Sequence, residues 1–180
     1  MRFVPLAVQG AWRLEPELRP DDRGFFARTW CVQEARDHGI EVTFVQTSTS
    51  FNDIAGTLRG LHYQAEPHAE SKLVRCTAGS IFDVIVDLRP ESPSHRKWHG
   101  ETLSAKNRFG LYIPKGCAHG FVTLEGDSEV LYHISELYHP ESACGVRWND
   151  PALAIEWPRA PTRVAPRDAE FALLPPVDKP

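Results

Sequence analysis

Residues 110–121 read GLYIPKGCAHGF. The apolar residues at both ends of this stretch indicate two β-strands, and Pro114 with Gly116 marks a tight turn between them. The turn delivers His119 at the start of the second strand. We therefore regard His119 as a candidate functional residue of a fold that is built from strands and turns.

The same pattern of short strands and turns continues on both sides of this stretch. The chain has 15 prolines and 12 glycines, and turns recur about every eight to twelve residues, as in a sandwich or barrel. One short helix is expected at residues 32–38, ended by Gly39. The expected strands are residues 43–50, 58–64, 72–76, 81–88, 98–103, 109–113, 120–124 and 129–135. This order predicts an all-β fold of antiparallel strands with short peripheral helices.

The length of the chain, 180 residues, fits one domain with a sizeable core. We expect residues 1–180 to form a single domain that begins with an N-terminal strand region at about residues 1–20. Prolines dominate after Trp157, so a C-terminal segment at about residues 158–180 is expected to wrap the barrel surface. Its last few residues are expected to be loosely attached.

Composition excludes several classes of partner. Hydrophobic residues make up 42% of the chain, charged residues make up 24%, and the net charge is −4. Without a basic excess we expect no nucleic-acid partner, and no apolar run approaches the roughly 20 residues that span a bilayer. The first residues, MRFVP, lack a signal-peptide pattern, so we expect a cytoplasmic location.

The four cysteines form no CxxC pair and are expected to be reduced thiols. Cys117 is the one to examine, because it lies near His119.

A second segment with reactive side chains is LRGLHYQ, residues 58–64. Alternate residues of a strand share a face, so we expect His62 and Gln64 to point one way and Arg59 and Tyr63 the other. A third segment is EVLYH, residues 129–133, which carries Tyr132. Taken alone, a strand histidine or tyrosine is more often a packed core residue than a catalyst. Several such residues in one barrel carry more weight than any one of them.

The string PKGCAH, residues 114–119, has the P-x-G-x-x-H form of the second cupin motif. The first motif of metal-binding cupins supplies an H-x-H pair and a carboxylate, and here the matching place reads His62-Tyr63-Gln64. Two histidines without a well-placed carboxylate make a poor site for a divalent metal. We therefore predict a cupin-type jelly-roll barrel with no metal and no cofactor, in which an interior histidine transfers protons.

Beyond these motifs, the chain resembles the dTDP-4-dehydrorhamnose 3,5-epimerases, which are cupins of the sugar-nucleotide pathways. The resemblance runs from about residue 22 to residue 168. The strings that carry it are DRGFF (22–26), FVQ (44–46), LRGLHYQ (58–64), KLV (72–74), DVIVDLR (83–89), IPKGCAHGF (113–121) and RWNDP (147–151).

This resemblance implies roles for individual residues. His62 falls on the family's general base and Asp168 on the carboxylate paired with it. Tyr132 falls on the general acid of the opposite face, and Lys72 on the lysine that stabilises the enolate oxygen. The positions that fall on substrate contacts or on places that meet the nucleotide are Arg23, Phe26, Arg28, Gln46, Ser48, Arg59, His119 and Arg167.

The implied activity is epimerisation of a nucleotide-linked 4-keto-6-deoxy sugar. A ketone at carbon 4 acidifies the hydrogens on carbons 3 and 5, and removal of one proton forms an enolate whose oxygen needs a nearby cation. Return of a proton from the other face inverts the carbon, so a base and an acid must face each other. The resemblance also implies a homodimer with an exchanged N-terminal strand, which would cover a sheet edge.

Three positions depart from the family pattern. Arg28 stands where a glutamate is usual, Ser48 where an asparagine is usual, and Ala143 where a glutamate is usual. Arg167 replaces a lysine and keeps the charge. Glutamate accepts from the N–H of thymine, whereas arginine only donates. A CDP-linked substrate is therefore an alternative to a dTDP-linked one.

Further alternatives stay open at the level of sequence. Relatives in deoxysugar pathways act at carbon 3 alone or at carbon 5 alone while they keep the same base and acid. A cupin that only binds a sugar nucleotide, without catalysis, is a candidate of another class, but it would not need His62, Lys72 and Tyr132 together. A metal-dependent cupin oxygenase or isomerase is disfavoured by Gln64 in place of a second histidine.

Overall fold

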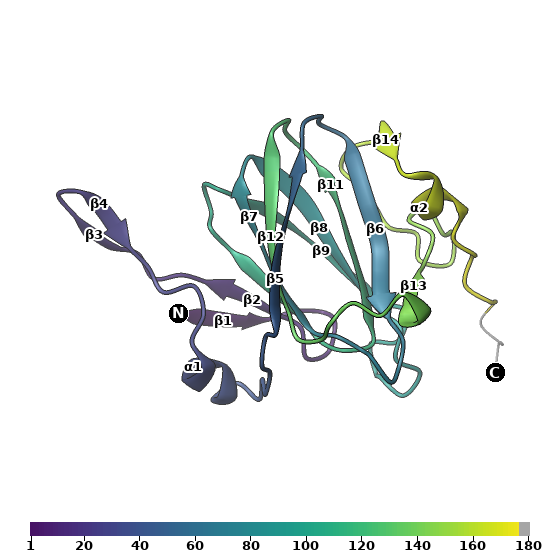
Figure 1. Ribbon diagram of the computed structural model, residues 1–180, viewed down its shortest axis with the longest axis horizontal. Helices are drawn as coiled ribbons and strands as arrows, with labels where there is room; N and C mark the ends of the chain where they lie inside the picture. Colours follow the sequence, from purple (N-terminus) through teal and green to yellow (C-terminus); the bar gives the residue numbers. More distant parts are fainter. Residues whose placement is uncertain (177–180) are drawn as a thin grey trace.

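A computed structural model describes residues 1–176 of the protein, and its core is two antiparallel sheets that face each other as a jelly-roll barrel (Figure 1). The first sheet has the order β1 (Arg2–Pro5), β2 (Trp12–Glu15), β10 (Gly110–Ile113), β7 (Lys72–Ala78), β12 (Ser128–Ile134) and β5 (Gln46–Asn52). The second has the order β13 (Ala143–Gly145), β6 (Thr57–Gln64), β11 (Cys117–Thr123), β8 (Ser80–Asp87) and β9 (Trp98–Ser104), and β14 (Arg163–Val164) pairs with the first two residues of β6. This architecture confirms the predicted all-β antiparallel fold.

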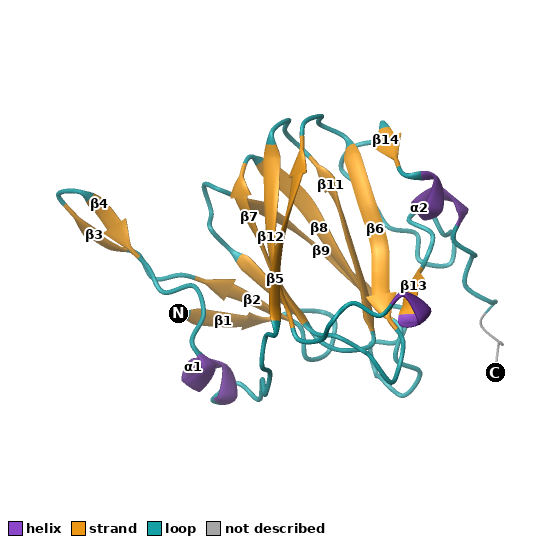
Figure 2. Ribbon diagram, viewed as in Figure 1, coloured by secondary structure: helices purple, strands orange, loops and turns teal. Residues whose placement is uncertain are grey.

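The helices are short and lie at the periphery of the barrel (Figure 2). They are α1 (Val32–Arg36), α2 (Pro166–Glu170) and a 3₁₀ turn at Pro140–Ser142. The helix expected at residues 32–38 is confirmed, although its regular part ends at Arg36 and the chain turns at Gly39, whose φ is +75°. No helix within residues 1–176 is long and apolar enough to cross a membrane.

The main core lies between the two sheets and follows the alternation of side chains along each strand. On β8, Ile81 and Ile85 point into the barrel with Phe121 and Val130. Val84 on the same strand points outward into a second cluster beneath the C-terminal segment. Burial of these apolar side chains stabilises the barrel by about 25 cal/mol per Å² removed from water. The same alternation points Asp83 inward between the two isoleucines.

Two predicted strands begin three residues away from their expected first residue. The strand expected at residues 43–50 begins at Gln46, because Gln46 pairs with Ile134, the last residue of its partner strand β12. The strand expected at residues 120–124 begins earlier, at Cys117, because it pairs with β8 from Asp87 onward. His119 therefore lies inside this strand.

All four cysteines are free, as predicted. Cys117 is buried in the main core, and this burial raises the pKa of its thiol to about 12. A thiol with so high a pKa stays protonated at neutral pH and is a poor nucleophile. Cys117 is therefore a packing residue.

In the part that the structure describes, the C-terminal segment crosses the outside of the second sheet. Here β14 pairs in parallel with β6, and Arg147 Nε donates a hydrogen bond of 2.7 Å to the carbonyl of Phe171. These contacts place α2 against β6 and bring Asp168 to the barrel. The final residues of the predicted segment, 177–180, lie outside the described residues.

Candidate active site

Two adjoining clefts open on the barrel between β5, β6, β7 and β12. The inner cleft has a volume of about 310 Å³ and is lined by Ser48, Ser50, Arg59, His62, Lys72, His119, Phe121, Tyr132 and Ile134. The outer cleft, of about 200 Å³, is lined by Gln46, His62, Tyr63, Gln64, Glu70, Lys72, Ile134, Tyr138, Ala143, Cys144 and Arg167. Since His62, Lys72 and Ile134 line both, a ligand longer than either cleft could occupy the two together.

His62 and Asp168 form a hydrogen-bonded pair at the junction of the clefts. Nε2 of His62 lies 2.7 Å from Oδ1 of Asp168, and the backbone N–H of Gly60 donates to Oδ2 of the same carboxylate at 3.0 Å. Burial alone would raise the pKa of Asp168, but the hydrogen bonds from His62 and Gly60 and the charge of Arg167 hold it below its ordinary value. An ionised Asp168 accepts from Nε2–H, which leaves the lone pair of the imidazole on Nδ1.

Among residues 58–64, the predicted strand face is wrong for Arg59. Arg59 and His62 line the same inner cleft, although simple alternation puts them on opposite faces. The pairing of β6 with β11 changes register here: His62 pairs with His119 and Arg59 with Phe121, so β6 has one extra residue. A β-bulge of this kind changes the face of the strand to which the preceding side chains point.

A close backbone approach explains the glycine in this bulge. Gly60 has a φ of +128°, and a Cβ atom there would lie 2.5 Å from the Cα of Gly120 on β11. Glycine alone combines this backbone conformation with this approach. The same backbone presents its N–H to Asp168.

Tyr132 reaches the inner cleft from the other sheet. Its hydroxyl lies 3.3 Å from Oγ of Ser50 on the neighbouring strand β5. Burial raises the pKa of the Tyr132 phenol far above its ordinary value, and the contact with Ser50 opposes this only in part. Tyr132 therefore stays a protonated donor at neutral pH.

Lys72 brings a positive charge close to His62. Its ammonium group donates to the carbonyl of His62 at 3.3 Å and forms an ion pair of 2.9 Å with Glu70. The side chains of Lys72 and Glu70 are 11% and 6% exposed. A buried cation with a fixed position suits the stabilisation of a developing oxyanion.

His119 and Asp83 form a second pair, in which both side chains are buried. Nε2 of His119 lies 2.8 Å from Oδ2 of Asp83, while Oδ1 of Asp83 is buried without a hydrogen-bond partner among the described residues. Burial raises the pKa of Asp83, against the lowering influence of His119. The ring of His119 also packs edge-on against Tyr132, with centroids 6.1 Å apart. Asp83 thus orients the imidazole that borders the phenol.

The structure brings most of the predicted nucleotide contacts to the clefts. Arg59 and Ser48 line the inner cleft, and Gln46 and Arg167 line the outer one. The amide nitrogen of Gln46 is already engaged, because it donates to the carbonyl of Glu136 at 2.7 Å.

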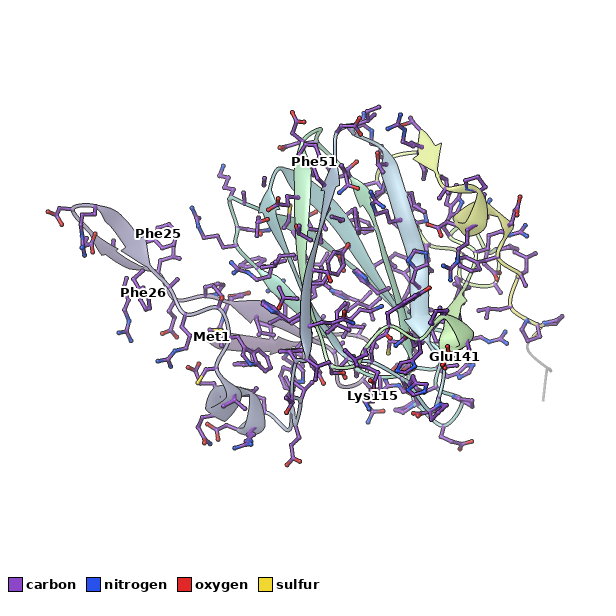
Figure 3. All side chains as sticks on the ribbon, in the orientation of Figure 1. Met1, Phe25, Phe26, Phe51, Lys115 and Glu141 are labelled. Carbon is purple, nitrogen blue, oxygen red and sulfur yellow. The ribbon has the colours of Figure 1, made fainter. Side chains whose placement is uncertain are left out.

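Three predicted contacts lie elsewhere in the chain. Arg23, Phe26 and Arg28 belong to or follow the hairpin of β3 (Arg19–Asp21) and β4 (Gly24–Phe26), which projects away from the barrel (Figure 1). Phe26 is 68% exposed on this hairpin (Figure 3). Arg28 forms an exposed ion pair of 2.8 Å with Glu34. Within one chain, these residues do not line the clefts that hold His62.

Several residues around the clefts escaped the sequence analysis. The sequence pattern could have identified Asp83 as a candidate, because it is a charged residue at an inward strand position between two apolar residues. Ser50, Glu70 and Tyr138 had no local pattern that sets them apart. Phe171, whose ring centroid lies 5.9 Å from that of His62, comes from an irregular segment that only the folded chain brings near.

Comparisons with known proteins identify relatives of the whole chain. A family model described as dTDP-4-dehydrorhamnose 3,5-epimerase matches residues 5–175. The enzyme of that name from Escherichia coli (strain K12) is 45% identical over 177 residues, which cover 97% of this chain and 95% of the relative.

Two solved structures match almost the whole chain. One is the dTDP-4-dehydrorhamnose 3,5-epimerase of Bacillus anthracis str. Ames with TDP and PPi bound, with a TM-score of 0.92, 42% identity, and coverage of 96% of this chain and 99% of that one. The other is the dTDP-6-deoxy-D-glucose-3,5-epimerase of Legionella pneumophila Philadelphia 1 in complex with dTDP-4-keto-L-rhamnose, with a TM-score of 0.89, 37% identity, and coverage of 96% and 92%. The barrel, the motifs and these matches together show that the chain belongs to the dTDP-4-dehydrorhamnose 3,5-epimerase family.

Proposed function

We propose that the protein epimerises a dTDP-linked 4-keto-6-deoxy sugar, converting dTDP-4-dehydro-6-deoxy-D-glucose into dTDP-4-dehydro-L-rhamnose. The observation that carries this proposal is that His62 and Tyr132 face one inner cleft from opposite sheets. The family of the chain and the nucleotide sugar bound by the relative from Legionella pneumophila support the choice of substrate. Roles for the individual residues remain predictions.

The proposed reaction begins with removal of a proton from carbon 3 or carbon 5. Nδ1 of His62 takes the proton, and the electron pair of the broken C–H bond forms an enolate with the oxygen of the carbon-4 ketone. Lys72 stabilises the negative oxygen, and Asp168 stabilises the imidazolium through Nε2. The inner cleft provides room for a sugar ring between these groups.

Inversion requires that the new proton arrive from the opposite face. The Tyr132 hydroxyl donates its proton to the enolate carbon, where the electron pair forms the new C–H bond and the ketone returns. Solvent then reprotonates the phenolate and removes the proton from His62. Because no electrons leave the sugar, the reaction needs no redox cofactor.

Binding of the nucleotide half uses the remaining cationic and polar residues. The guanidinium of Arg59 suits the diphosphate, and Nε of this residue is held by Oδ1 of Asn52 at 2.8 Å. The outer cleft, with Gln46, Tyr138 and Arg167, is the proposed place of the nucleoside.

The projecting hairpin supports a homodimer. Phe25 and Phe26 are 45% and 68% exposed, and exposed aromatic residues on a protruding hairpin are typical of a protein interface. We propose that this hairpin, with Arg23 and Phe26, reaches the clefts of a second copy and completes its nucleotide site. The cytoplasmic location remains a prediction.

The contacts of Arg28 give no reason to prefer a cytosine nucleotide. Its guanidinium is paired with Glu34 in the same chain, so it need not face the base. Calorimetric titration of the protein with dTDP and with CDP tests this point. We expect dTDP to bind more tightly, and a clear preference for CDP would contradict it.

Product analysis tests the proposed function as a whole. The purified protein is incubated with dTDP-4-dehydro-6-deoxy-D-glucose, the keto product is reduced with borohydride, and the released sugars are identified. We expect sugars that are inverted at both carbon 3 and carbon 5. Inversion at one carbon alone would replace the proposal by a mono-epimerase, and an unchanged substrate would indicate a protein that only binds the nucleotide sugar.

A further inference from the structure

A group of metal-ligand side chains lies outside the inner cleft. The side chains of His68, Glu136 and His139 place one possible ligand atom each within 4.8 Å of the others, and all three residues are half-buried. They come from two loops, one after β6 and one after β12. The proposed proton transfer uses none of them.

The imidazole of His139 is oriented as a metal ligand would be. Its Nδ1 lies 3.2 Å from Oε1 of Glu141, and its Nε2 lies 3.9 Å from Oε1 of Glu136. If Nδ1–H donates to Glu141, the lone pair of Nε2 points to the Glu136 side. A carboxylate behind a histidine in this way is the usual second partner of a metal-bound imidazole. Glu141 lies next to β13 at the edge of the barrel (Figure 3).

His68 supplies the second imidazole. Its ring stacks on that of His139, with centroids 3.4 Å apart and planes at 9°. Neighbouring ligand atoms in a tetrahedral zinc site are about 3.3 Å apart, given bonds of about 2.0 to 2.2 Å. The distance of 3.9 Å between Nε2 of His139 and Oε1 of Glu136 is therefore about half an ångström too long for two ligands of one zinc ion. The His68 ring must also turn so that its lone pair meets the ion.

One buried side chain holds the two loops together. The amide nitrogen of Gln64 donates to the carbonyls of His68 and Leu137, each at 3.0 Å. Its amide oxygen accepts from the backbone N–H of His139 at 2.6 Å. Gln64 is only 5% exposed, so these bonds are shielded from water. The backbones that carry both histidines are thus fixed before any ion binds, which lowers the entropy lost on binding.

We propose that His68, Glu136 and His139 bind a Zn²⁺ ion, with Glu141 as the carboxylate partner of His139. Two imidazoles and one carboxylate are a donor set that Zn²⁺ favours, and water would complete the tetrahedron. Tyr138 lies between two of the ligands in the sequence and lines the outer cleft. An ion here fixes the segment that carries Tyr138. The site is separate from the barrel interior, where the sequence predicts no metal.

Calorimetry with ZnCl₂ tests the proposal on full-length protein that has been stripped with chelator and carries no histidine tag. We expect one Zn²⁺ per chain. The substitutions His139→Gln and Glu136→Gln should weaken binding by about 100-fold or more, and Glu141→Gln by about 10-fold. His38→Gln is the matched control, because His38 follows α1 on the other side of the barrel from β13 (Figure 1), and it should leave binding unchanged.

Cobalt provides a second readout that does not depend on activity. Co²⁺ in a tetrahedral site gives intense visible absorption bands, which we expect in the wild type and in His38→Gln but not in His139→Gln. Circular dichroism identifies any variant that fails to fold, and the isosteric Glu136→Gln then serves in its place. Absence of saturable binding by the wild type, or binding of Zn²⁺ by His139→Gln and Glu136→Gln as tightly as by the wild type, would overturn the proposal. Because no substrate is present, either result leaves the proposed epimerase activity untouched.

Discussion

His62 and Tyr132 face the same inner cleft from strands that belong to different sheets, β6 and β12. The space between the sheets therefore separates the imidazole from the phenol. We expect a sugar ring held there to present one face to each group.

The pair of His62 and Asp168 should act as one unit. We expect His62→Ala to lower kcat/KM by about 10²- to 10⁴-fold, because it removes the base. Asp168→Asn should also lower it strongly, because the amide no longer accepts from Nε2 as a carboxylate does. Once His62 is absent, the loss of Asp168 should add little. Steady-state kinetics of the two single variants and the double variant measure this, and fully additive losses would show that the two residues act independently.

The raised pKa of Tyr132 predicts how inversion depends on pH. An ordinary tyrosine has a pKa of about 10, and burial moves that of Tyr132 upward. The protonated donor is then present at every pH below about 10, so we expect no alkaline loss of inversion in that range. Inversion and solvent exchange are measured side by side from pH 7 to pH 10. A loss of inversion near pH 8 while exchange persists would rule out Tyr132 as a high-pKa donor.

A mixing experiment tests whether the hairpin works in the partner subunit. Arg23→Ala and His62→Ala should each be nearly inactive as homodimers. If Arg23 serves the other chain, a heterodimer of the two variants has one intact site, and a random mixture regains about a quarter of wild-type activity. Co-expression with two different tags gives this mixture. If Arg23 serves its own chain, no heterodimer has an intact site and no activity returns.

The bulge at Gly60 should be sensitive to a single methyl group. Gly60→Ala combines a disallowed φ with a contact of 2.5 Å to the Cα of Gly120, so we expect it to cost about 3 kcal/mol or more of unfolding free energy. Gly39→Ala is the control, because that glycine also has a positive φ but has open space around it. It should cost about 1 kcal/mol. Urea unfolding measures both, and equal effects would show that the approach to Gly120 is unimportant.

The fold could be predicted, and candidates for the proton transfer could be named, because both follow from local patterns. Tight turns and alternating strands fixed the barrel, and the strings around His62 and His119 carried the family resemblance. The face of Arg59 could not be predicted, since the bulge at Gly60 depends on the approach of β11, a partner far away in the sequence. Phe171 was not predicted either, because only the folded chain brings it near His62.

The structure brings the candidate nucleotide contacts together less completely than the candidate proton-transfer residues. Arg23 and Phe26 lie on a hairpin that projects away from the barrel of its own chain (Figure 1). The sequence does not indicate whether this hairpin contacts a cleft of its own chain or a cleft of a second copy. The placement of His62, Lys72, Tyr132 and Asp168 depends on contacts within one chain, which the fold itself brings together.

Proton NMR in deuterium oxide tests most directly whether His62 removes a proton next to the ketone. The substrate is dTDP-4-dehydro-6-deoxy-D-glucose, and the signals of the hydrogens on carbons 3 and 5 are followed with wild type, His62→Ala and Tyr132→Phe. We predict that wild type replaces both hydrogens by deuterium with inversion, that Tyr132→Phe exchanges without completing inversion, and that His62→Ala exchanges neither. Exchange by His62→Ala at the wild-type rate would contradict the account.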